Sequence, residues 1–133
     1  MTLGIEIDDL DLNSTATEEL RTLLAEHGVL ILRNQPLDDA GFLAFLRRFG
    51  DMMFTEGETP VPGFPDLNVI SNVGRTTPPK STFHVDTTYV PNPPAYTALR
   101  AVEVPEAGGS TLFSDQYAAY DTLPAGPESE PGR

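Results

Sequence analysis

The stretch Thr82-Phe83-His84-Val85-Asp86 is a candidate β-strand. On a strand, residues two apart point to the same face, so the His84 imidazole and the Asp86 carboxylate can bind one metal ion while Val85 points into the opposite layer. A mixed imidazole–carboxylate pair suits a divalent first-row metal. With one further histidine it forms the facial triad of non-haem Fe(II) oxygenases, which leaves positions open for a co-substrate and O₂.

The same spacing also fits a purely structural pair, in which a histidine at a strand end is hydrogen-bonded to a nearby aspartate. The surrounding region is rich in proline: nine of the 13 prolines lie between Pro60 and Pro105. Because proline cannot donate to a sheet ladder, strands here must be short and separated by long loops. We expect strands over 68–71, 82–86, 98–102 and 111–114, a turn over 105–109 and a helix beginning at Gln116.

The first fifty residues predict helices packed outside a sheet, an α+β arrangement. Thr15 and Glu18 have the spacing of a capping box, which marks a helix start, and Gly28 is a typical helix end. The expected elements are a strand over 3–7, a helix from the capping box to Gly28, a strand over 29–32, and a helix from Asp38 or Asp39 to Gly50.

The amino-acid composition excludes several classes of function. The chain has 133 residues, a formal net charge of −12 and no cysteine. The length fits one domain, and the lack of cysteine excludes disulfides, Cys-ligated zinc, iron–sulfur clusters and thiol nucleophiles. The acidic balance argues against binding to nucleic acid or anionic membranes. No apolar run approaches the roughly 20 residues that span a bilayer, and no secretory signal is present, so we expect a cytoplasmic protein.

Further motifs flank the His84-Val85-Asp86 triplet in a consistent order. In order and spacing they resemble the TauD/TfdA (taurine dioxygenase) family of Fe(II)/2-oxoglutarate-dependent dioxygenases over residues 3–124, the N-terminal portion of such an enzyme. We therefore expect residues 1–123 to be the N-terminal part of the domain and 124–133 to be a disordered Pro/Gly/Glu tail. The matching segments are 28–35, Arg48-Phe49-Gly50, Pro93-Pro94, Leu99-Arg100-Ala101, 108–113 and 118–124.

This resemblance implies a partial double-stranded β-helix (jelly-roll, cupin-like) core with the N-terminal helices outside it. It implies that His84 and Asp86 are iron ligands and catalytic residues, and that Thr111 hydrogen-bonds a carboxylate of the co-substrate 2-oxoglutarate. The expected reaction hydroxylates a small organic substrate with O₂ and converts 2-oxoglutarate to succinate. An aspartate at position 86 favours hydroxylation over halogenation, because related halogenases have a small residue there.

The resemblance also implies a second histidine far downstream as third iron ligand and an arginine after that histidine, and we expect the chain to end before either appears. His27 lies on the apolar face of the first predicted helix, next to its end, where a helix-end role is favoured over metal binding. We therefore expect the chain to be truncated before the third iron ligand and inactive by itself. Half a jelly roll leaves sheet edges unpaired, which predicts low stability or self-association into a homo-oligomer.

The substrate is less defined by the sequence. Lys80 is a candidate anchor for an anionic substrate, with a solvated loop lysine as the alternative, and Phe83 replaces the tryptophan of taurine-specific members. Taurine is therefore disfavoured. Two other interpretations stay open. One is a non-catalytic jelly-roll binding module or inactive fragment in which His84 and Asp86 are a structural pair; the other is a half-chain completed by a partner.

Overall fold

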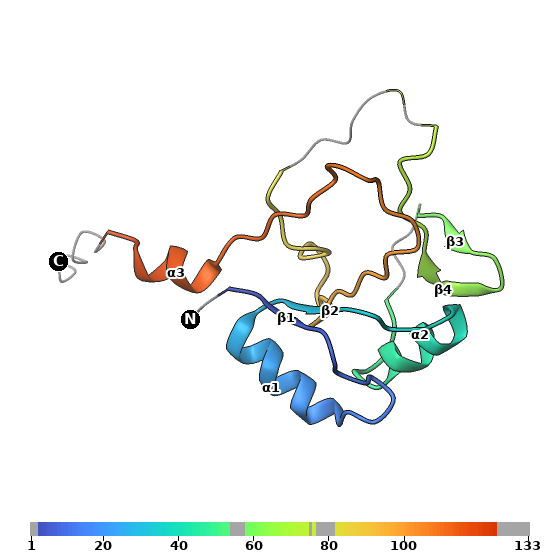
Figure 1. The fold of residues 1–133 in the computed structure, drawn as a ribbon. Coiled ribbons are helices and arrows are strands. Elements are labelled where there is room, and N and C mark those ends of the chain that lie inside the picture. Colours follow the sequence, from blue (N-terminus) through green and yellow to red (C-terminus); the bar gives the residue numbers. More distant parts are fainter. Residues whose placement is uncertain (1–2, 54–57, 75, 77–81, 125–133) are drawn as a thin grey trace.

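The computed structural model describes residues 3–53, 58–74, 76 and 82–124 (Figure 1). It contains a small amount of both helix and sheet, which confirms the mixed α and β content predicted from the sequence. No helix in the described part of the chain is long and apolar enough to cross a membrane. The elements, in order, are β1 (Ile5–Ile7), α1 (Thr17–His27), β2 (Leu30–Leu32), α2 (Asp39–Arg47), β3 (Pro60–Val61), β4 (Phe64–Asn68) and α3 (Gln116–Asp121).

The N-terminal layer is built on a two-stranded parallel sheet of β1 and β2, in which Ile5 pairs with Leu30 and Glu6 with Ile31. Residues at alternate positions point to opposite faces of a strand. Ile5 and Leu30 are half-buried, whereas Glu6 and Ile31 are exposed. Helix α1, which connects the two strands, contacts β2 (Figure 1). Helix α1 therefore packs on one face of the sheet, and the Glu6 and Ile31 side chains of the other face are exposed.

The ends of the two N-terminal helices follow local signals in the sequence. Gly28 adopts φ +71° and its N–H donates to the Leu24 carbonyl at 2.7 Å, so it ends α1 as predicted. At the start of α2, the Asp38 side chain accepts a hydrogen bond from the Gly41 N–H at 2.7 Å. Asp38 is thus the N-cap. The helix ends at Arg47, earlier than the predicted end at Gly50.

The predicted capping box at the start of α1 is wrong. The N-cap position is Ala16, and no side chain caps the helix there. The Thr15 hydroxyl instead donates to the Asp11 carbonyl at 2.7 Å. Because the hydroxyl is engaged in this preceding turn, it does not bond the N–H groups of the first helical turn, and Glu18 has no partner for the reciprocal bond.

A β-hairpin of β3 and β4 replaces the strand predicted over 68–71. Its turn contains Gly63 at φ +82°, a left-handed conformation that glycine adopts without a Cβ clash. The ladder pairs Pro60 with Asn68 and Val61 with Phe64, and the Val69 N–H donates to the Thr59 carbonyl at 2.8 Å. The pairing thus begins earlier in the chain than predicted, because the position of the turn fixes which residues face each other.

The strands predicted over 82–86, 98–102 and 111–114 are also wrong, since all three segments are irregular. A strand exists only where its backbone groups pair with a neighbour. None of the three takes part in a sheet ladder of the described residues. The predicted jelly-roll core is therefore not formed in the described part of the chain. Helix α3 begins at Gln116 as expected, with the Asp115 side chain as its N-cap at 3.0 Å from the Ala118 N–H.

Arg48 ties the end of α2 to the beginning of α1. Its guanidinium donates to the Leu12 and Thr15 carbonyls and, at 3.0 Å, to the Thr17 hydroxyl. These acceptors lie more than 30 residues away in sequence. One side chain therefore satisfies two carbonyl oxygens of the turn that leads into α1 and the hydroxyl oxygen of the first residue of α1.

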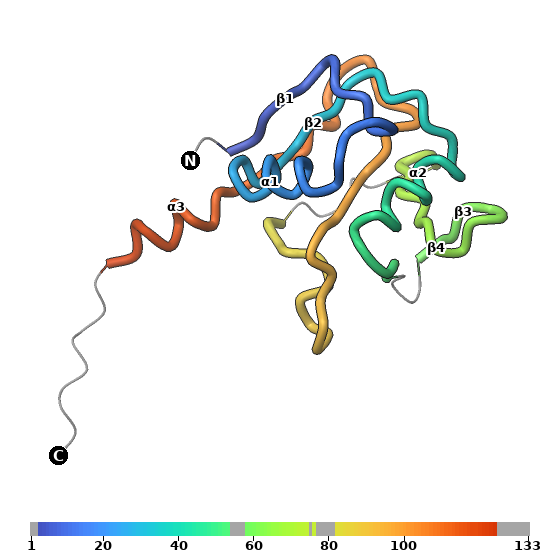
Figure 2. The backbone as a smooth tube through the Cα atoms, turned by 90° about the horizontal axis from the view of Figure 1, so that it is seen from below, coloured from blue at the N-terminus to red at the C-terminus, as the bar shows by residue number. Residues whose placement is uncertain are grey.

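Arg100 holds the irregular C-terminal segment against α2. It donates to the Leu37 carbonyl and forms an ion pair with Asp39, and its guanidinium lies 5.7 Å from the Phe42 ring centroid. Its side chain is 25% exposed. Figure 2 shows the segment around residue 100 crossing the N-terminal layer before the chain turns toward α3.

The buried core of the described residues consists of Leu12, Leu20 and Leu67. Leu20, on the inner face of α1, is only 1% exposed. By contrast, many large apolar side chains after residue 98 are exposed to solvent, among them Leu99, Val102, Leu112, Tyr117, Tyr120 and Leu123. The fold depends on a very small apolar interior.

We predict that Leu20→Ala lowers the free energy of unfolding by about 2–5 kcal/mol, because a fully buried leucine leaves a cavity when truncated. The matched control is Leu123→Ala: Leu123 is 65% exposed, so its truncation should change the same quantity by less than about 0.5 kcal/mol. Urea unfolding followed by circular dichroism measures both. Equal effects of the two substitutions would contradict the assignment of the core.

We also predict concentration-dependent self-association, because the exposed apolar side chains after residue 98 favour contact with other molecules. The net charge of −12 opposes association. Added salt screens that repulsion, so it should increase the average mass in sedimentation velocity. A sharp thermal transition of a monomer at every concentration and salt level would show this expectation to be wrong.

Candidate metal centre

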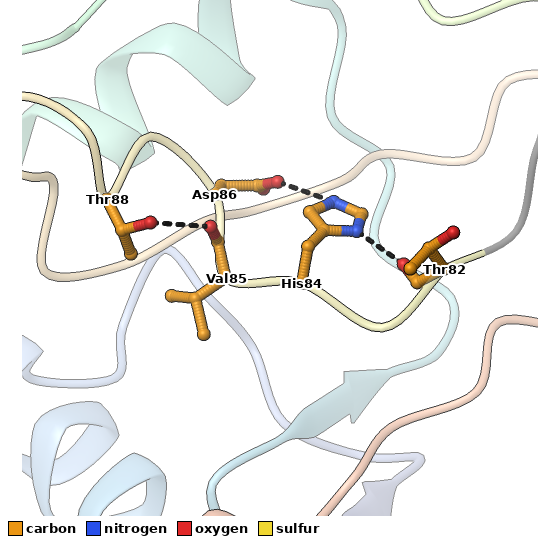
Figure 3. Close-up of polar contacts among 5 residues, drawn as sticks. All are labelled: Thr82, His84, Val85, Asp86 and Thr88. Atoms are coloured by element: carbon orange, nitrogen blue, oxygen red, sulfur yellow. Dashed lines mark hydrogen bonds and ion pairs between the residues drawn. The ribbon is translucent and has the colours of Figure 1, made fainter.

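His84 and Asp86 face each other although the segment that carries them is not a strand. The His84 Nε2 atom lies 3.0 Å from Asp86 Oδ1, and the Val85 side chain points away from the pair (Figure 3). Residues 82–85 are irregular and residues 86–89 form a turn. The alternation expected of a strand is thus present locally without a strand partner.

The other imidazole nitrogen of His84 is fixed by the backbone. His84 Nδ1 lies 2.7 Å from the carbonyl oxygen of Thr82 (Figure 3). A carbonyl oxygen only accepts hydrogen bonds, so Nδ1 carries the proton and donates it. This bond orients the ring and directs Nε2 toward Asp86. Histidines that bind metals have the same support, with one ring nitrogen donating to a carbonyl or carboxylate.

With Nδ1 protonated, the neutral imidazole presents a lone pair at Nε2 to a carboxylate oxygen, which also presents lone pairs. Two lone pairs 3.0 Å apart repel each other unless a positive charge lies between them. That charge is either a proton on Nε2 or a bound cation. Without a metal, the proton fills this role. The Thr82 carbonyl and, second, the charge of Asp86 raise the pKa of His84 above its ordinary value, and desolvation opposes them.

The pair is accessible to solvent. The His84 side chain is 72% exposed and that of Asp86 is 48% exposed. In the described part of the chain, no group of three or more His, Cys, Asp or Glu side chains is arranged to hold a metal. His84 and Asp86 therefore offer two ligands, and any further ligand comes from outside this cluster.

The remaining predicted site residues are not gathered around the pair. Phe83 is 66% exposed. Thr111 is exposed in an irregular segment, and no hydrogen bond among the described residues joins it to His84 or Asp86. Lys80 lies outside the described residues. His27 is in the last turn of α1, as the sequence indicated, and its Nδ1 is buried without a hydrogen-bond partner in the described structure.

Two features of the site were not predicted from the sequence. One is the Thr82 carbonyl, which has no sequence signature because every residue carries a carbonyl. The other is Thr87, which directly follows Asp86 and adopts φ +55°. Threonine is β-branched and rarely adopts this conformation, so the residue type gave no indication of it.

Comparison with known proteins assigns the chain to a class of dioxygenases. A family model described as "Taurine catabolism dioxygenase TauD, TfdA family" matches residues 2–129. The chain belongs to this family, whose enzymes use Fe(II) and take 2-oxoglutarate (α-ketoglutarate) as co-substrate. The resemblance inferred from the sequence motifs is thereby confirmed. No solved structure matches the chain.

Curated relatives share about a third of the aligned residues. An α-ketoglutarate-dependent sulfonate dioxygenase of Saccharomyces cerevisiae is 32% identical over 91% of this chain and 33% of its own length. An α-ketoglutarate-dependent 2,4-dichlorophenoxyacetate dioxygenase of Cupriavidus pinatubonensis is 32% identical over 93% of this chain and 50% of its own length. An α-ketoglutarate-dependent sulfate ester dioxygenase of Pseudomonas putida is 30% identical over 86% of this chain and 38% of its own length. The chain thus spans half or less of these relatives.

We predict that Asp86→Asn lowers the pKa of His84 toward its ordinary value, because the substitution removes a negative charge 3.0 Å from Nε2. Part of the elevation should persist, since the Thr82 carbonyl contributes the largest share. NMR titration of the imidazole protons measures the change. Glu18→Gln, on α1, is the matched control and should leave the pKa of His84 unchanged. An unchanged value in Asp86→Asn would show that the two side chains do not face each other in solution.

Proposed function

We propose that His84 and Asp86 are two protein ligands of the Fe(II) centre of a 2-oxoglutarate-dependent dioxygenase that hydroxylates a small organic molecule. One observation carries this proposal. The Thr82 carbonyl fixes the imidazole so that the Nε2 lone pair and the Asp86 carboxylate face the same point. Family membership supports the reaction class.

The spacing of the two atoms fits adjacent ligands of one metal ion. Two ligands at right angles, each about 2.1 Å from a divalent first-row ion, lie about 3.0 Å apart. The distance between His84 Nε2 and Asp86 Oδ1 is 3.0 Å. One neutral nitrogen and one anionic oxygen also match the ligand types of the facial triad. The residues present therefore fit an iron ion.

Each residue then has a specific role. His84 holds Fe(II) through Nε2 with its ring oriented by Thr82, and Asp86 supplies one negative charge and the second ligand. Thr111 donates its hydroxyl hydrogen to a carboxylate oxygen of 2-oxoglutarate. Bound iron, with O₂ and 2-oxoglutarate, supplies the oxidising chemistry that converts the substrate C–H to C–OH while the co-substrate becomes succinate and CO₂. The carboxylate at position 86 favours hydroxylation over halogenation.

The other ligands of such a centre come from beyond this pair. A third protein ligand and an arginine for the 2-oxoglutarate carboxylate are needed, since bidentate binding of a carboxylate suits a guanidinium. The chain spans half or less of the length of these relatives, which supports a site completed by further polypeptide. By itself the chain should hold iron weakly and form no succinate.

The substrate we propose is a small organic anion. The names of the relatives specify a sulfonate, 2,4-dichlorophenoxyacetate and sulfate esters, all of which carry a negative charge at neutral pH. Phe83, which precedes His84 in the sequence and is 66% exposed, is the candidate apolar contact for the substrate. Lys80 is the candidate cation for the anionic group.

A second function is favoured by one observation: the 3.0 Å contact forms a complete ion pair whenever His84 is protonated. The chain would then be a non-catalytic binding module or an inactive fragment in which the pair is structural. Metal binding distinguishes the two functions, because a structural pair has no need of a cation.

We predict that Mn²⁺, a redox-stable substitute for Fe²⁺, broadens the amide signals of residues 82–88 in ¹⁵N NMR spectra. Paramagnetic broadening detects weak binding, which suits a site with two protein ligands. Addition of 2-oxoglutarate should lower the Mn²⁺ concentration required, because its keto and carboxylate oxygens supply two more ligands. Succinate lacks the keto oxygen and should have a smaller effect.

Two substitutions and one control complete this experiment. His84→Gln and Asp86→Asn should each abolish the broadening, whereas Asp115→Asn, which removes a carboxylate elsewhere in the chain, should preserve it. Broadening spread evenly over the acidic surface of the protein, or an identical response in all three variants, would reject the metal centre and favour the structural pair.

A further inference from the structure

The turn that follows Asp86 contains a conformation that its residue does not favour. Thr87 adopts φ +55°, and it shares this value only with Asn34 among the described non-glycine residues. Asparagine visits the left-handed region readily because its short side chain makes local hydrogen bonds. A β-branched residue there is a genuine outlier. Such conformations persist only where the surrounding structure imposes them, and they cluster at functional sites.

The contacts around Thr87 show what imposes its conformation. Its carbonyl accepts a hydrogen bond from the Val90 N–H at 3.3 Å, which closes the turn. Thr87 and Val90 are half-buried, whereas residues 82–86, 88 and 89 are exposed. Thr87 and Val90 are thus the two least exposed positions of the segment 82–90. No hydrogen bond of the Thr87 hydroxyl is present in the described structure, so the backbone rather than the hydroxyl carries the effect.

We infer that Thr87 is a positioning residue, whose left-handed backbone reverses the chain immediately after Asp86 and thereby holds the Asp86 carboxylate against His84 Nε2. His84 is oriented from its N-terminal side by the Thr82 carbonyl at 2.7 Å. Thr87 orients the partner from the C-terminal side. The two side chains are thus fixed independently, one by a backbone acceptor and the other by a backbone torsion.

This inference deepens the proposed function, on which its metal-binding part rests. A carboxylate that must be reoriented before it can bind loses affinity, and loss of supporting interactions around ligands typically costs about 10–100-fold in metal affinity. A substitution that prevents positive φ at position 87 should therefore weaken Mn²⁺ binding by at least about tenfold. A substitution that permits positive φ should preserve it.

The test compares three substitutions at one position. Proline fixes φ near −65° and excludes the left-handed region, whereas glycine and asparagine both accept it. Thr87→Pro should abolish Mn²⁺ broadening of residues 82–86 at the concentration that broadens the unsubstituted protein. Thr87→Asn and Thr87→Gly should retain the broadening. Unchanged amide signals of α1 and α2 in Thr87→Pro would show that the N-terminal layer is still folded.

A second measurement needs no metal and separates this inference from the proposed function. The nuclear Overhauser effect between the His84 Hε1 proton and the Asp86 Hβ protons reports their contact in the metal-free chain. It should be present in the unsubstituted protein, Thr87→Asn and Thr87→Gly, and absent in Thr87→Pro. If the unsubstituted protein shows this contact but binds no Mn²⁺, the metal centre is wrong and the positioning role stands.

Two outcomes would overturn the positioning role. One is a Thr87→Pro variant that keeps both the His84–Asp86 contact and the Mn²⁺ response. The other is a Thr87→Asn variant that loses them as completely as Thr87→Pro, because the threonine side chain, and not the backbone torsion, would then be required. A turn that does not orient Asp86 predicts instead that all three variants keep the His84–Asp86 contact.

Discussion

The described structure depends on guanidinium groups that reach across it, because its apolar interior is so small. Arg48 binds oxygens of the turn that leads into α1, and Arg100 binds the start of α2. Arg21 adds a third link: it lies 5.5 Å from the ring centroids of both Phe49 and Tyr96 and donates to the Phe49 carbonyl at 3.0 Å. Hydrogen bonds from a charged donor are among the stronger ones. These contacts connect segments that the buried leucines alone do not join.

Because distant contacts hold this fold together, only those parts of it that depend on neighbouring residues could be predicted from the sequence. Gly28 and Asp38 act within a few residues of themselves, so their helix end and helix cap were recognisable. The strands expected over 98–102 and 111–114 needed distant partners, and residue pattern does not reveal whether a partner strand is present. Thr15 shows a subtler failure: its hydroxyl donates to the Asp11 carbonyl in the preceding turn and does not accept a hydrogen bond from an N–H of the first helical turn.

The candidate site also contains some features that could be predicted from the sequence and others that could not. The approach of His84 and Asp86 is local, since only one residue separates them; the sequence predicted that they share a side, although on a strand that is not formed. The Thr82 carbonyl and the φ angle of Thr87 are backbone properties that any residue type can supply. Thr111 is different again: its predicted role depends on folding of a segment that has no sheet partner in the described structure. Its role and that of the metal pair stay proposals.

The exposure of the pair sets a physical condition on any oxygenase function. Oxidising intermediates need a site that excludes water, because water competes for the open metal positions and for the oxidant. His84 is 72% exposed, and the side chains of the apolar residues nearby in the sequence, Phe83, Val85 and Tyr89, are 65–77% exposed. A layer that covered these residues would bury apolar surface and exclude water from the proposed metal site in the same step.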